Sequence, residues 1–270
     1  MMSKNELIKQ PSLIMGILNI TPDSFSDGGK YNTVQDATMH VREMIRDGAN
    51  IIDIGGVSTR PGYSYVSISE EIKRVIPVIK AVRETFPDVV ISVDTWRSEV
   101  AELAIQAGAN MLNDEWGAKY DRRMAELAKI HNIPICLMHN RSDSNYTNFM
   151  EDVKNDLLES VGICKDVGVP DKHIILDPGF GFVKTDKQNL EILRHIDEIV
   201  VLGYDVLLAT SRKSTIGLVL DLPVHERMEG TGATVVFGIS KGCRIFRVHD
   251  VKNIARMARM TDAIVGNITI

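Results

Sequence analysis

Short apolar runs recur along the chain, and stretches with the apolar spacing of amphipathic helices lie between them. The runs are Leu13–Leu18, Ile51–Ile54, Val89–Val93, Met111–Leu112, Ile133–Met138, Ile174–Leu176, Val206–Ala209 and Ile245–Val248. Because they are apolar on both faces, they are typical of parallel strands buried between helices. Eight such strand–helix units predict an α/β fold, a single (β/α)8 TIM barrel, and the alternative is a doubly wound open sheet.

The stretches between the runs predict the helices of these units. After Ser67, whose spacing to Glu70 fits a capping box, one apolar stripe continues to Phe86. Pro77 should kink this helix without ending it. Further helices are expected at residues 97–107, 121–131, 148–167 and 251–265. Expected C-terminal caps are Gly48, Gly108, Gly168 and Gly242.

The composition is that of an ordinary globular protein, with 44% hydrophobic and 25% charged residues among 270. One barrel of roughly 250 residues uses nearly this whole length. We therefore expect one domain over residues 1–270, with residues 1–12 as a short N-terminal extension. The apolar runs are too short to span a membrane, and MMSKNELIKQPS lacks the apolar core of a secretory signal. The expected location is the cytoplasm.

Charge and cysteine content exclude several classes of function. The net charge of −5 argues against a general nucleic-acid-binding surface and against binding to an anionic membrane. Cys136, Cys164 and Cys243 are widely spaced in apolar surroundings, as expected of reduced, buried thiols. The sequence contains no CxxC, HExxH or P-loop pattern, which excludes the zinc and nucleotide sites that depend on them.

A polar side chain stands at the carboxyl end of each predicted strand, although the strands themselves are apolar. These residues are Asn19, Asp53, Asp94, Asn113, His139, Asp177, Ser211 with Lys213, and Arg247 with His249. Because the active site of a (β/α)8 barrel lies at the C-terminal ends of its strands, the sequence predicts one functional pocket there.

The chemistry of these side chains restricts the classes of ligand that fit the predicted pocket. Asp94, Asn113 and Asp177 would lie in a mostly enclosed funnel, where they favour a planar heterocycle edge rich in hydrogen-bond donors. Arg60, Arg247 and His249 are cationic donors that suit phosphate. The residues alone therefore predict a ligand with a heterocycle at one end and a phosphate group at the other.

Other interpretations of single residues stay open at this point. Lys213 and Arg212 also fit solvated surface charges, and His139 or His249 also fits a hydrogen-bonded structural histidine. Asp53 either touches a ligand or orients other donors.

Two segments near the N-terminus closely resemble the signatures of the dihydropteroate synthases. They are MGILNITPDSFSDGG at residues 15–29 and DIGGVSTRPG at residues 53–62. Further matches follow in order: SVDT at 92–95, LND at 112–114, LDPGFGF at 176–182, SRKS at 211–214 and RVHD at 247–250. The resemblance extends from about residue 13 to about residue 265 and thus covers the whole predicted barrel.

This resemblance implies a magnesium-dependent transferase of folate biosynthesis. Such enzymes condense 6-hydroxymethyl-7,8-dihydropterin pyrophosphate with 4-aminobenzoate, giving 7,8-dihydropteroate and pyrophosphate. The reduced pterin can delocalise a cation at its methylene carbon and the arylamine is neutral, so an SN1-like route needs no general base. Alternatives are a methyltetrahydrofolate-dependent corrinoid methyltransferase, which does not need the TRPG and RVH segments for phosphate, and a non-catalytic pterin-binding barrel.

The resemblance also implies which residues bind the pterin. Asp177 would bind the 2-amino and N3–H edge, with Asn113 beside it. Asp94 would face the N–H of the reduced ring, and Lys213 would face the 4-oxo and N5 side. Arg247 would stack on the ring and reach the pyrophosphate.

The remaining implied roles concern pyrophosphate, metal and arylamine. Pyrophosphate would also contact His249, Arg60 and Asn19, and Asn19 would be the protein ligand of Mg²⁺. The implied catalytic groups, which stabilise charge, are Asp94, Lys213, Arg247 and His249. The implied aminobenzoate cleft consists of Phe25, Thr59, Pro61, Phe182 and Ser214.

Three places depart from the commonest pattern of the family: Val57, Glu115–Trp116 and Val183. None of them replaces an implied ligand, so we expect altered loop packing and retained activity. The resemblance also suggests a homodimer, and the small residues of Gly230–Gly242 offer a surface for close packing between two copies.

Overall fold

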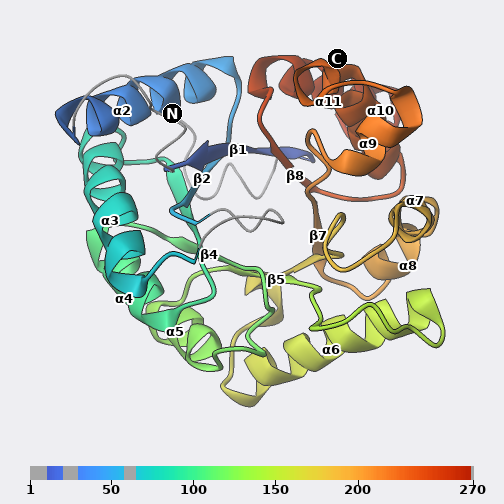
Figure 1. Ribbon diagram of the computed structural model, residues 1–270, viewed down its shortest axis with the longest axis horizontal. Coiled ribbons are helices and arrows are strands. Elements are labelled where there is room, and N and C mark those ends of the chain that lie inside the picture. The colour runs from blue at the N-terminus through green and yellow to red at the C-terminus, as the bar shows by residue number, and fades with distance from the viewer. Residues whose placement is uncertain (1–10, 21–29, 58–64, 269–270) are drawn as a thin grey trace.

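The computed structural model describes residues 11–20, 30–57 and 65–268, and its strands form a closed, parallel barrel in sequence order (Figure 1). The strands are β1 (Leu13–Asn19), β2 (Ile51–Gly55), β3 (Val90–Asp94), β4 (Met111–Asp114), β5 (Ile135–Met138), β6 (Ile174–Asp177), β7 (Asp205–Leu208) and β8 (Ile245–Val248). Met15 of β1 lies opposite Ile51 of β2 on one side and Arg247 of β8 on the other. Because β1 pairs with β8, the predicted (β/α)8 barrel is confirmed and the open sheet is wrong.

Helices surround the strands on the outside of the ring (Figure 1). They are α2 (Lys30–Asp47), α3 (Ile68–Thr85), α4 (Ser98–Ala107), α5 (Arg123–His131), α6 (Phe149–Asp166), α7 (Asp186–Arg194), α8 (Asp197–Val200), α9 (Ser214–Leu220), α10 (Met228–Ser240) and α11 (Val251–Ile264). Two short 3-10 turns cover Asp171–His173 and Val224–Glu226. The N-terminal extension predicted for residues 1–12 lies outside the described residues except for Pro11 and Ser12.

Apolar side chains form one layer inside the barrel and another between the strands and the helices. The inner cluster consists of Leu13, Met15, Ile51, Met111, Cys136, Ile175, Leu207, Ala209 and Ile245. Leu18 and Ile52, from alternate positions of β1 and β2, instead belong to the cluster that packs against the helices. Because side chains alternate along a strand, Asn19 and Asp53 share the inward direction of the inner cluster. The barrel interior therefore changes from apolar to polar toward the carboxyl ends of its strands.

The helix predictions hold to within two residues at each end for α4, α5, α6 and α11. At the start of α3, the Ser67 side chain accepts a hydrogen bond from the Glu70 backbone N–H at 3.2 Å, as in the predicted capping box. The Glu70 carboxylate accepts from Arg74 at 2.9 Å and does not complete the box. Pro77 lies inside the helix and does not end it, as predicted. The expected cap glycines all have positive φ: Gly48 (111°), Gly108 (118°), Gly168 (84°) and Gly242 (93°).

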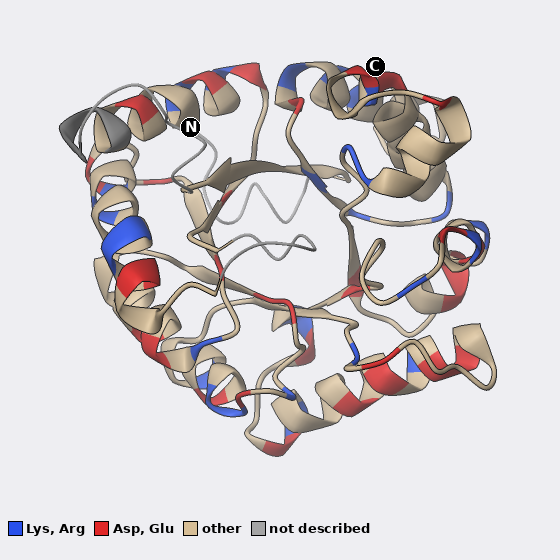
Figure 2. Cartoon of the chain, in the orientation of Figure 1, with Lys and Arg blue, Asp and Glu red and all other residues tan. Residues whose placement is uncertain are grey.

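The outer surface carries charges of both signs, interspersed over the helices (Figure 2). Within the described ranges, every helix is too short or too polar to cross a membrane. Cys136, Cys164 and Cys243 are buried and free, as predicted. Burial raises the pKa of Cys164 and of Cys243 to about 12, so both remain thiols at neutral pH.

Candidate active site

The carboxyl ends of β2, β3, β4 and β8 bring together four polar side chains that are far apart in the sequence. Arg247 donates from Nε to Asp53 Oδ2 at 2.6 Å and from Nη2 to Asp94 Oδ2 at 2.5 Å. Asn113 donates from Nδ2 to the same Asp53 oxygen at 3.2 Å. This confirms the predicted convergence at one mouth of the barrel, and it makes one guanidinium the partner of two carboxylates.

Asp53 orients these groups and is itself inaccessible. Its relative exposure is 0%, and one oxygen accepts hydrogen bonds from both Arg247 and Asn113. Its other oxygen, Oδ1, is buried without a hydrogen-bond partner among the described residues. Of the two roles left open by the sequence, these two hydrogen bonds favour orientation of Arg247 and Asn113.

Burial governs the ionisation of this cluster. It raises the pKa of Asp94, an effect that the Arg247 charge opposes and that the Asp53 and Glu115 carboxylates reinforce. For Arg247, burial acts toward a lower pKa, but the nearby Asp94 and Asp53 charges raise it above its ordinary value. The guanidinium therefore stays charged, and its contact with Asp94 favours the carboxylate form of that residue.

Asp177 ends β6 and is 2% exposed. Its Oδ1 accepts a hydrogen bond from the Gly179 backbone N–H at 2.7 Å. Burial raises the pKa of Asp177, whereas the Gly179 hydrogen bond and the charges of Lys213 and Arg247 act in the opposite direction. A carboxylate in this setting is a strong acceptor that gains from a ligand with hydrogen-bond donors.

The chain after β7 adds further predicted residues to the same end of the barrel. Ser211 Oγ lies 2.9 Å from His249 Nδ1 and accepts the backbone N–H of His249 at 3.1 Å. The serine hydroxyl can then donate to Nδ1, which selects the imidazole tautomer with its proton on Nε2. Lys213 precedes α9, and its Nζ lies 4.2 Å from the centre of the Phe182 ring. Ser214, the first residue of α9, is exposed.

Two residues whose roles the sequence left open have structural partners. Arg212 is half-buried and donates to both carboxylate oxygens of Asp250, at 2.9 and 2.5 Å. His139 is 1% exposed and hydrogen bonds to Asp156 of α6 and to Lys184, as a structural histidine does. The predicted residues Phe25, Thr59, Arg60 and Pro61 lie outside the described residues.

Two arginines whose roles were not predicted from the sequence hold the chain on either side of residues 58–64, and one of them belongs to a buried ion pair. Arg97 donates to Glu71 Oε2 at 2.6 Å and to the Val66 carbonyl at 2.9 Å. Arg74 donates to the Gly56 carbonyl at 3.0 Å. Burial raises the pKa of Glu71, and Thr95 and Arg97 oppose this shift. The available signal was that Glu71 lies on the apolar stripe of α3, where an acidic residue needs a buried partner.

The departures from the family pattern have distinct local environments. Glu115 is 8% exposed and near enough to Asp94 to raise its pKa, so it adds negative charge to the polar cluster. Val183 has a φ of 47°, a left-handed conformation that is strained for a residue branched at Cβ. The expectation of altered loop packing stays a prediction. Val57 is half-buried at the end of a described range.

The oxygen ligands at the mouth of the barrel are compatible with a Mg²⁺ ion that is bound mainly by the substrate. Asn19 ends β1 with an inward carboxamide, a hard oxygen ligand of the type that Mg²⁺ accepts. Among the described residues no three His, Cys, Asp or Glu side chains cluster as a metal site would require. Mg²⁺ commonly takes one or two protein oxygens and completes its shell with water and substrate phosphates, so a single amide is compatible with it.

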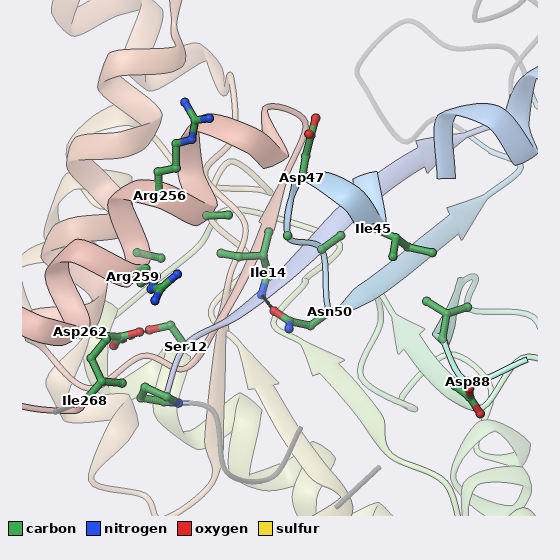
Figure 3. Close-up of a pocket in the computed structure, with 16 residues that line it drawn as sticks. Ser12, Ile14, Ile45, Asp47, Asn50, Asp88, Arg256, Arg259, Asp262 and Ile268 are labelled. Atoms are coloured by element: carbon green, nitrogen blue, oxygen red, sulfur yellow. Dashed lines mark hydrogen bonds between the residues drawn. The ribbon is translucent and has the colours of Figure 1, made fainter. Parts of the chain in front are cut away.

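A cavity lies near the amino-terminal ends of β1 and β2, and Figure 3 shows the side chains that line it. This cavity of about 740 Å³ is bordered by Ser12 and Ile14 at the start of β1 and by Arg259 and Asp262 of α11. Asp262 accepts a hydrogen bond from Ser12 Oγ at 2.9 Å. Because catalytic groups of (β/α)8 barrels come from the carboxyl ends of the strands, this cavity is not the reaction site.

The fold and the mouth together define a class of protein. A closed (β/α)8 barrel with buried aspartates, an amide and an arginine at its carboxyl end suits a flat, donor-rich heterocycle. The model of the pterin binding enzymes matches residues 15–249, which include every one of these groups.

Comparison with individual proteins shows to which family within this class the chain belongs. The dihydropteroate synthase of Clostridium beijerinckii is 58% identical over 264 residues, which cover 97% of this chain and 98% of that protein. The Bacillus subtilis enzyme is 58% identical over 258 residues, covering 96% and 90%. Among solved structures, the Clostridium difficile dihydropteroate synthase has a TM-score of 0.91 at 49% identity, covering 94% and 96%. The chain belongs to the dihydropteroate synthases, a family of pterin binding enzymes.

Proposed function

We propose that the chain joins the methylene carbon of 6-hydroxymethyl-7,8-dihydropterin pyrophosphate to the amino group of 4-aminobenzoate, releasing pyrophosphate. The observation that carries this proposal is the meeting of Asp94, Asn113, Asp177 and Arg247 at one barrel mouth. Two relatives support the choice of substrates. The Clostridium difficile structure was determined with pteroic acid, and a Xanthomonas albilineans dihydropteroate synthase, 35% identical with a TM-score of 0.89 over 94% of this chain and 93% of that one, was determined with 4-aminobenzoic acid.

Asp177 is assigned to the 2-amino and N3–H edge of the pterin. Its Oδ1 already accepts the Gly179 N–H, but each carboxylate oxygen has two lone pairs. Both oxygens thus remain able to accept the two parallel donors of the pterin edge. Asn113 is held beside this edge by its hydrogen bond to Asp53.

Arg247 and Asp94 exchange partners in the proposed binding step. Asp94 accepts from Arg247 Nη2, and the reduced ring of the pterin offers an N–H to the same carboxylate. When the pterin donates to Asp94, the Nη2 group of Arg247 becomes available for pyrophosphate. The hydrogen bond from Nε to Asp53 keeps the guanidinium at the mouth during this exchange.

Catalysis is assigned to charge stabilisation by these residues. As pyrophosphate leaves, Arg247 and His249 stabilise its negative charge, and Lys213 faces the 4-oxo and N5 side of the ring. Asp94 stabilises the positive charge that develops on the reduced pterin. Asn19 would hold Mg²⁺, which supplies Lewis-acid stabilisation of the leaving group.

The arylamine side is assigned to Phe182 and Ser214, with Lys213 stacked on the Phe182 ring. The neutral amine needs no general base, so this side only has to orient it. Arg60 stays a predicted pyrophosphate ligand, and the other predicted members of the cleft, Phe25, Thr59 and Pro61, also stay sequence predictions.

We also infer that the chain works as one barrel domain and forms a homodimer. Helix α10, which covers most of the predicted small-residue segment, exposes Val236 and Phe237, each at 40%. Exposed apolar side chains next to glycines suit packing against a second copy. The cytoplasmic location stays a prediction.

The proposal is tested by pyrophosphate release from purified protein supplied with the pterin pyrophosphate and Mg²⁺, with and without 4-aminobenzoate. Release should depend on the arylamine, and one 7,8-dihydropteroate should form for each pyrophosphate. Release at the same rate without arylamine, or no release at all, would overturn the proposal.

A further inference from the structure

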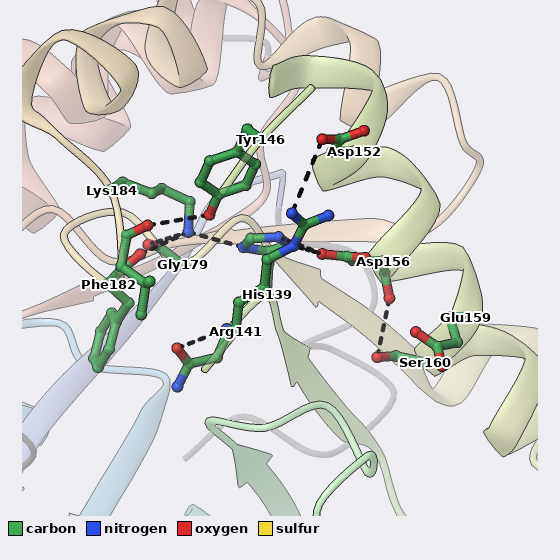
Figure 4. A network of polar contacts seen from close by, with 12 residues as sticks. His139, Arg141, Tyr146, Asp152, Asp156, Glu159, Ser160, Gly179, Phe182 and Lys184 are labelled. Carbon is green, nitrogen blue, oxygen red and sulfur yellow. Dashed lines mark hydrogen bonds and ion pairs between the residues drawn. The ribbon is translucent and has the colours of Figure 1, made fainter. Parts of the chain in front are cut away.

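A lysine outside the predicted site connects the loop between β6 and α7 to the residue that follows β5. Lys184, in the loop between β6 and α7, has its Nζ 2.8 Å from His139 Nδ1, 3.0 Å from the Gly179 carbonyl and 2.9 Å from the Phe182 carbonyl (Figure 4). A protonated lysine has three N–H donors and no acceptor, so these three partners use all of them. Two of the three hydrogen bonds fold residues 179–182 back onto the lysine.

The histidine in this network passes the anchorage to helix α6. Because the ammonium only donates, His139 Nδ1 accepts from Lys184, and Nε2–H donates to Asp156 Oδ2 at 2.9 Å. Burial, and then the Lys184 charge, lowers the pKa of His139 to about 3, so the ring is neutral. Arg141 also donates to the Asp156 carboxylate. The lysine is thus oriented by a neutral imidazole, and the hydrogen bond to Asp156 fixes the orientation of that imidazole.

The loop between β6 and α7 needs this support because its backbone is strained. Val183 has a φ of 47°, and Tyr146 donates from its hydroxyl to the Val183 carbonyl at 3.1 Å. Gly179, with a φ of 67°, lies so close to β5 that an added Cβ would be 2.1 Å from the His139 carbonyl oxygen. The loop therefore has little freedom to relax except by moving away from β5.

The same loop carries or supports groups of the proposed active site. The Gly179 N–H donates to Asp177, and the Phe182 ring lies against Lys213. Asp177 is also held by its strand, whereas Phe182 has no such support because it lies beyond β6. A shift of the loop should consequently affect the arylamine side more than the pterin edge.

We propose that Lys184, oriented by His139 and Asp156, is a positioning residue that fixes the loop between β6 and α7 for arylamine binding. This inference rests on the proposed function, because it assumes that Phe182 borders the arylamine. It adds a residue to the machinery that belongs to none of the predicted pterin, phosphate or cleft ligands.

Burial and the charges around Lys184 bring the loss of its ammonium proton close to neutral pH. Burial lowers the pKa of Lys184 to about 7; Asp177 and Asp156 oppose this shift, and Lys213 and Arg141 reinforce it. Above that pH the amine has one N–H fewer than its three partners require. The hold on the loop should therefore weaken as pH rises through neutrality.

The first test replaces Lys184 by methionine, which keeps the length of the side chain and removes every donor. We expect the Lys184→Met variant to raise the KM for 4-aminobenzoate about tenfold or more, as expected for lost hydrogen bonds to a charged group. The KM for the pterin pyrophosphate should stay within about threefold of wild type. Lys187→Met, at an exposed position in α7, is the matched control and should change neither value. An unchanged KM for 4-aminobenzoate in Lys184→Met, or an equal rise for both substrates, would overturn the inference.

Two further measurements separate positioning from a general structural role. Adding Val183→Gly relieves the strained backbone, so the double variant should recover most of the lost arylamine affinity, while Val183→Gly alone should behave as wild type. In wild type, the KM for 4-aminobenzoate should rise between about pH 6 and about pH 9, and in Lys184→Met it should stay flat. A flat wild-type profile would refute the inference even if the lysine variant failed to fold. Absence of any wild-type synthase activity would overturn the proposed function as well. If wild type is active and Lys184→Met has an unchanged KM for 4-aminobenzoate, only this inference is overturned.

Discussion

Replacing Arg247 by lysine tests whether geometry or charge matters at the mouth of the barrel. Arg247 donates from two different nitrogens to two different carboxylates, Asp53 and Asp94. Lysine keeps the positive charge, but it has a single nitrogen on a flexible stem and no planar surface to lie against a pterin. We therefore expect Arg247→Lys to lose turnover although the net charge is unchanged.

The size of the loss follows from the number of contacts. A hydrogen bond between charged partners contributes about 1.5–3 kcal/mol. If lysine preserves the contact with one carboxylate and loses the other, kcat/KM should fall about 10- to 150-fold. The loss should appear mainly in kcat, because the proposed role of the second guanidinium nitrogen is to stabilise the leaving pyrophosphate.

Steady-state kinetics for both substrates decide the matter, with denaturant unfolding to show that the variant is folded. Arg244→Lys is a suitable control, because Arg244 pairs with Asp205 near the start of β7, at the opposite end of the barrel, at 2.6 Å. This exchange should leave kcat/KM within about twofold of wild type, because the half-buried pair lies far from the mouth of the barrel and lysine keeps its charge. If Arg247→Lys also stayed within about twofold, charge alone would suffice and the geometric argument would be refuted.

Three other outcomes are expected. Asp177→Asn should weaken binding of the pterin pyrophosphate by about 2–5 kcal/mol in calorimetry, because an amide cannot accept two parallel donors; unchanged affinity in a soluble variant would contradict this assignment. Since burial raises the pKa of Asp177, wild-type pterin affinity should fall with decreasing pH sooner than the ordinary aspartate pKa of about 3.9 predicts, and Asp177→Asn should lack this dependence. Glu71→Gln should lower the free energy of unfolding in urea by about 3 kcal/mol by leaving Arg97 buried without a counter-ion. Glu70→Gln, at an exposed pair with Arg74, should cost less than about 1 kcal/mol, and equal losses would argue against a special role for Glu71.

The barrel itself could be predicted from the sequence because its strands are buried on both faces. Runs such as Ile245–Val248 stand out against amphipathic helices. The structure reproduces the boundaries of this run, and the other strands begin and end within two residues of their predicted limits. The main error in a strand start is at β5, which begins at Ile135 and not at Ile133. Pro134 lies between them, and proline has no backbone N–H to donate to a neighbouring strand. The helices α7, α8 and α9 were not predicted. For α8 and α9, four and seven residues give too little periodicity.

The site was predictable where one residue type marks a strand end, and unpredictable where a contact joins distant segments. Asp94 and Asp177 interrupt apolar runs and are therefore conspicuous in the sequence. The contacts of Lys184 are different, because its partner His139 is 45 positions away and that histidine's other partner, Asp156, belongs to a helix. No local pattern distinguishes such a lysine from a solvated one, so its role depends on tertiary structure alone.

Asp53 shows why the polar layer at the mouth reflects function and not folding. A fully buried carboxylate with one oxygen unpartnered among the described residues is costly, and an apolar residue of similar size would suit the barrel interior better. The cost is offset only if the orientation of Arg247 and Asn113 matters, because these are the two groups that Asp53 holds. Stability alone would extend the inner apolar cluster to the ends of the strands. That β2 carries an aspartate between Ile52 and Ile54 therefore indicates selection for a ligand, at some expense to the stability of the barrel.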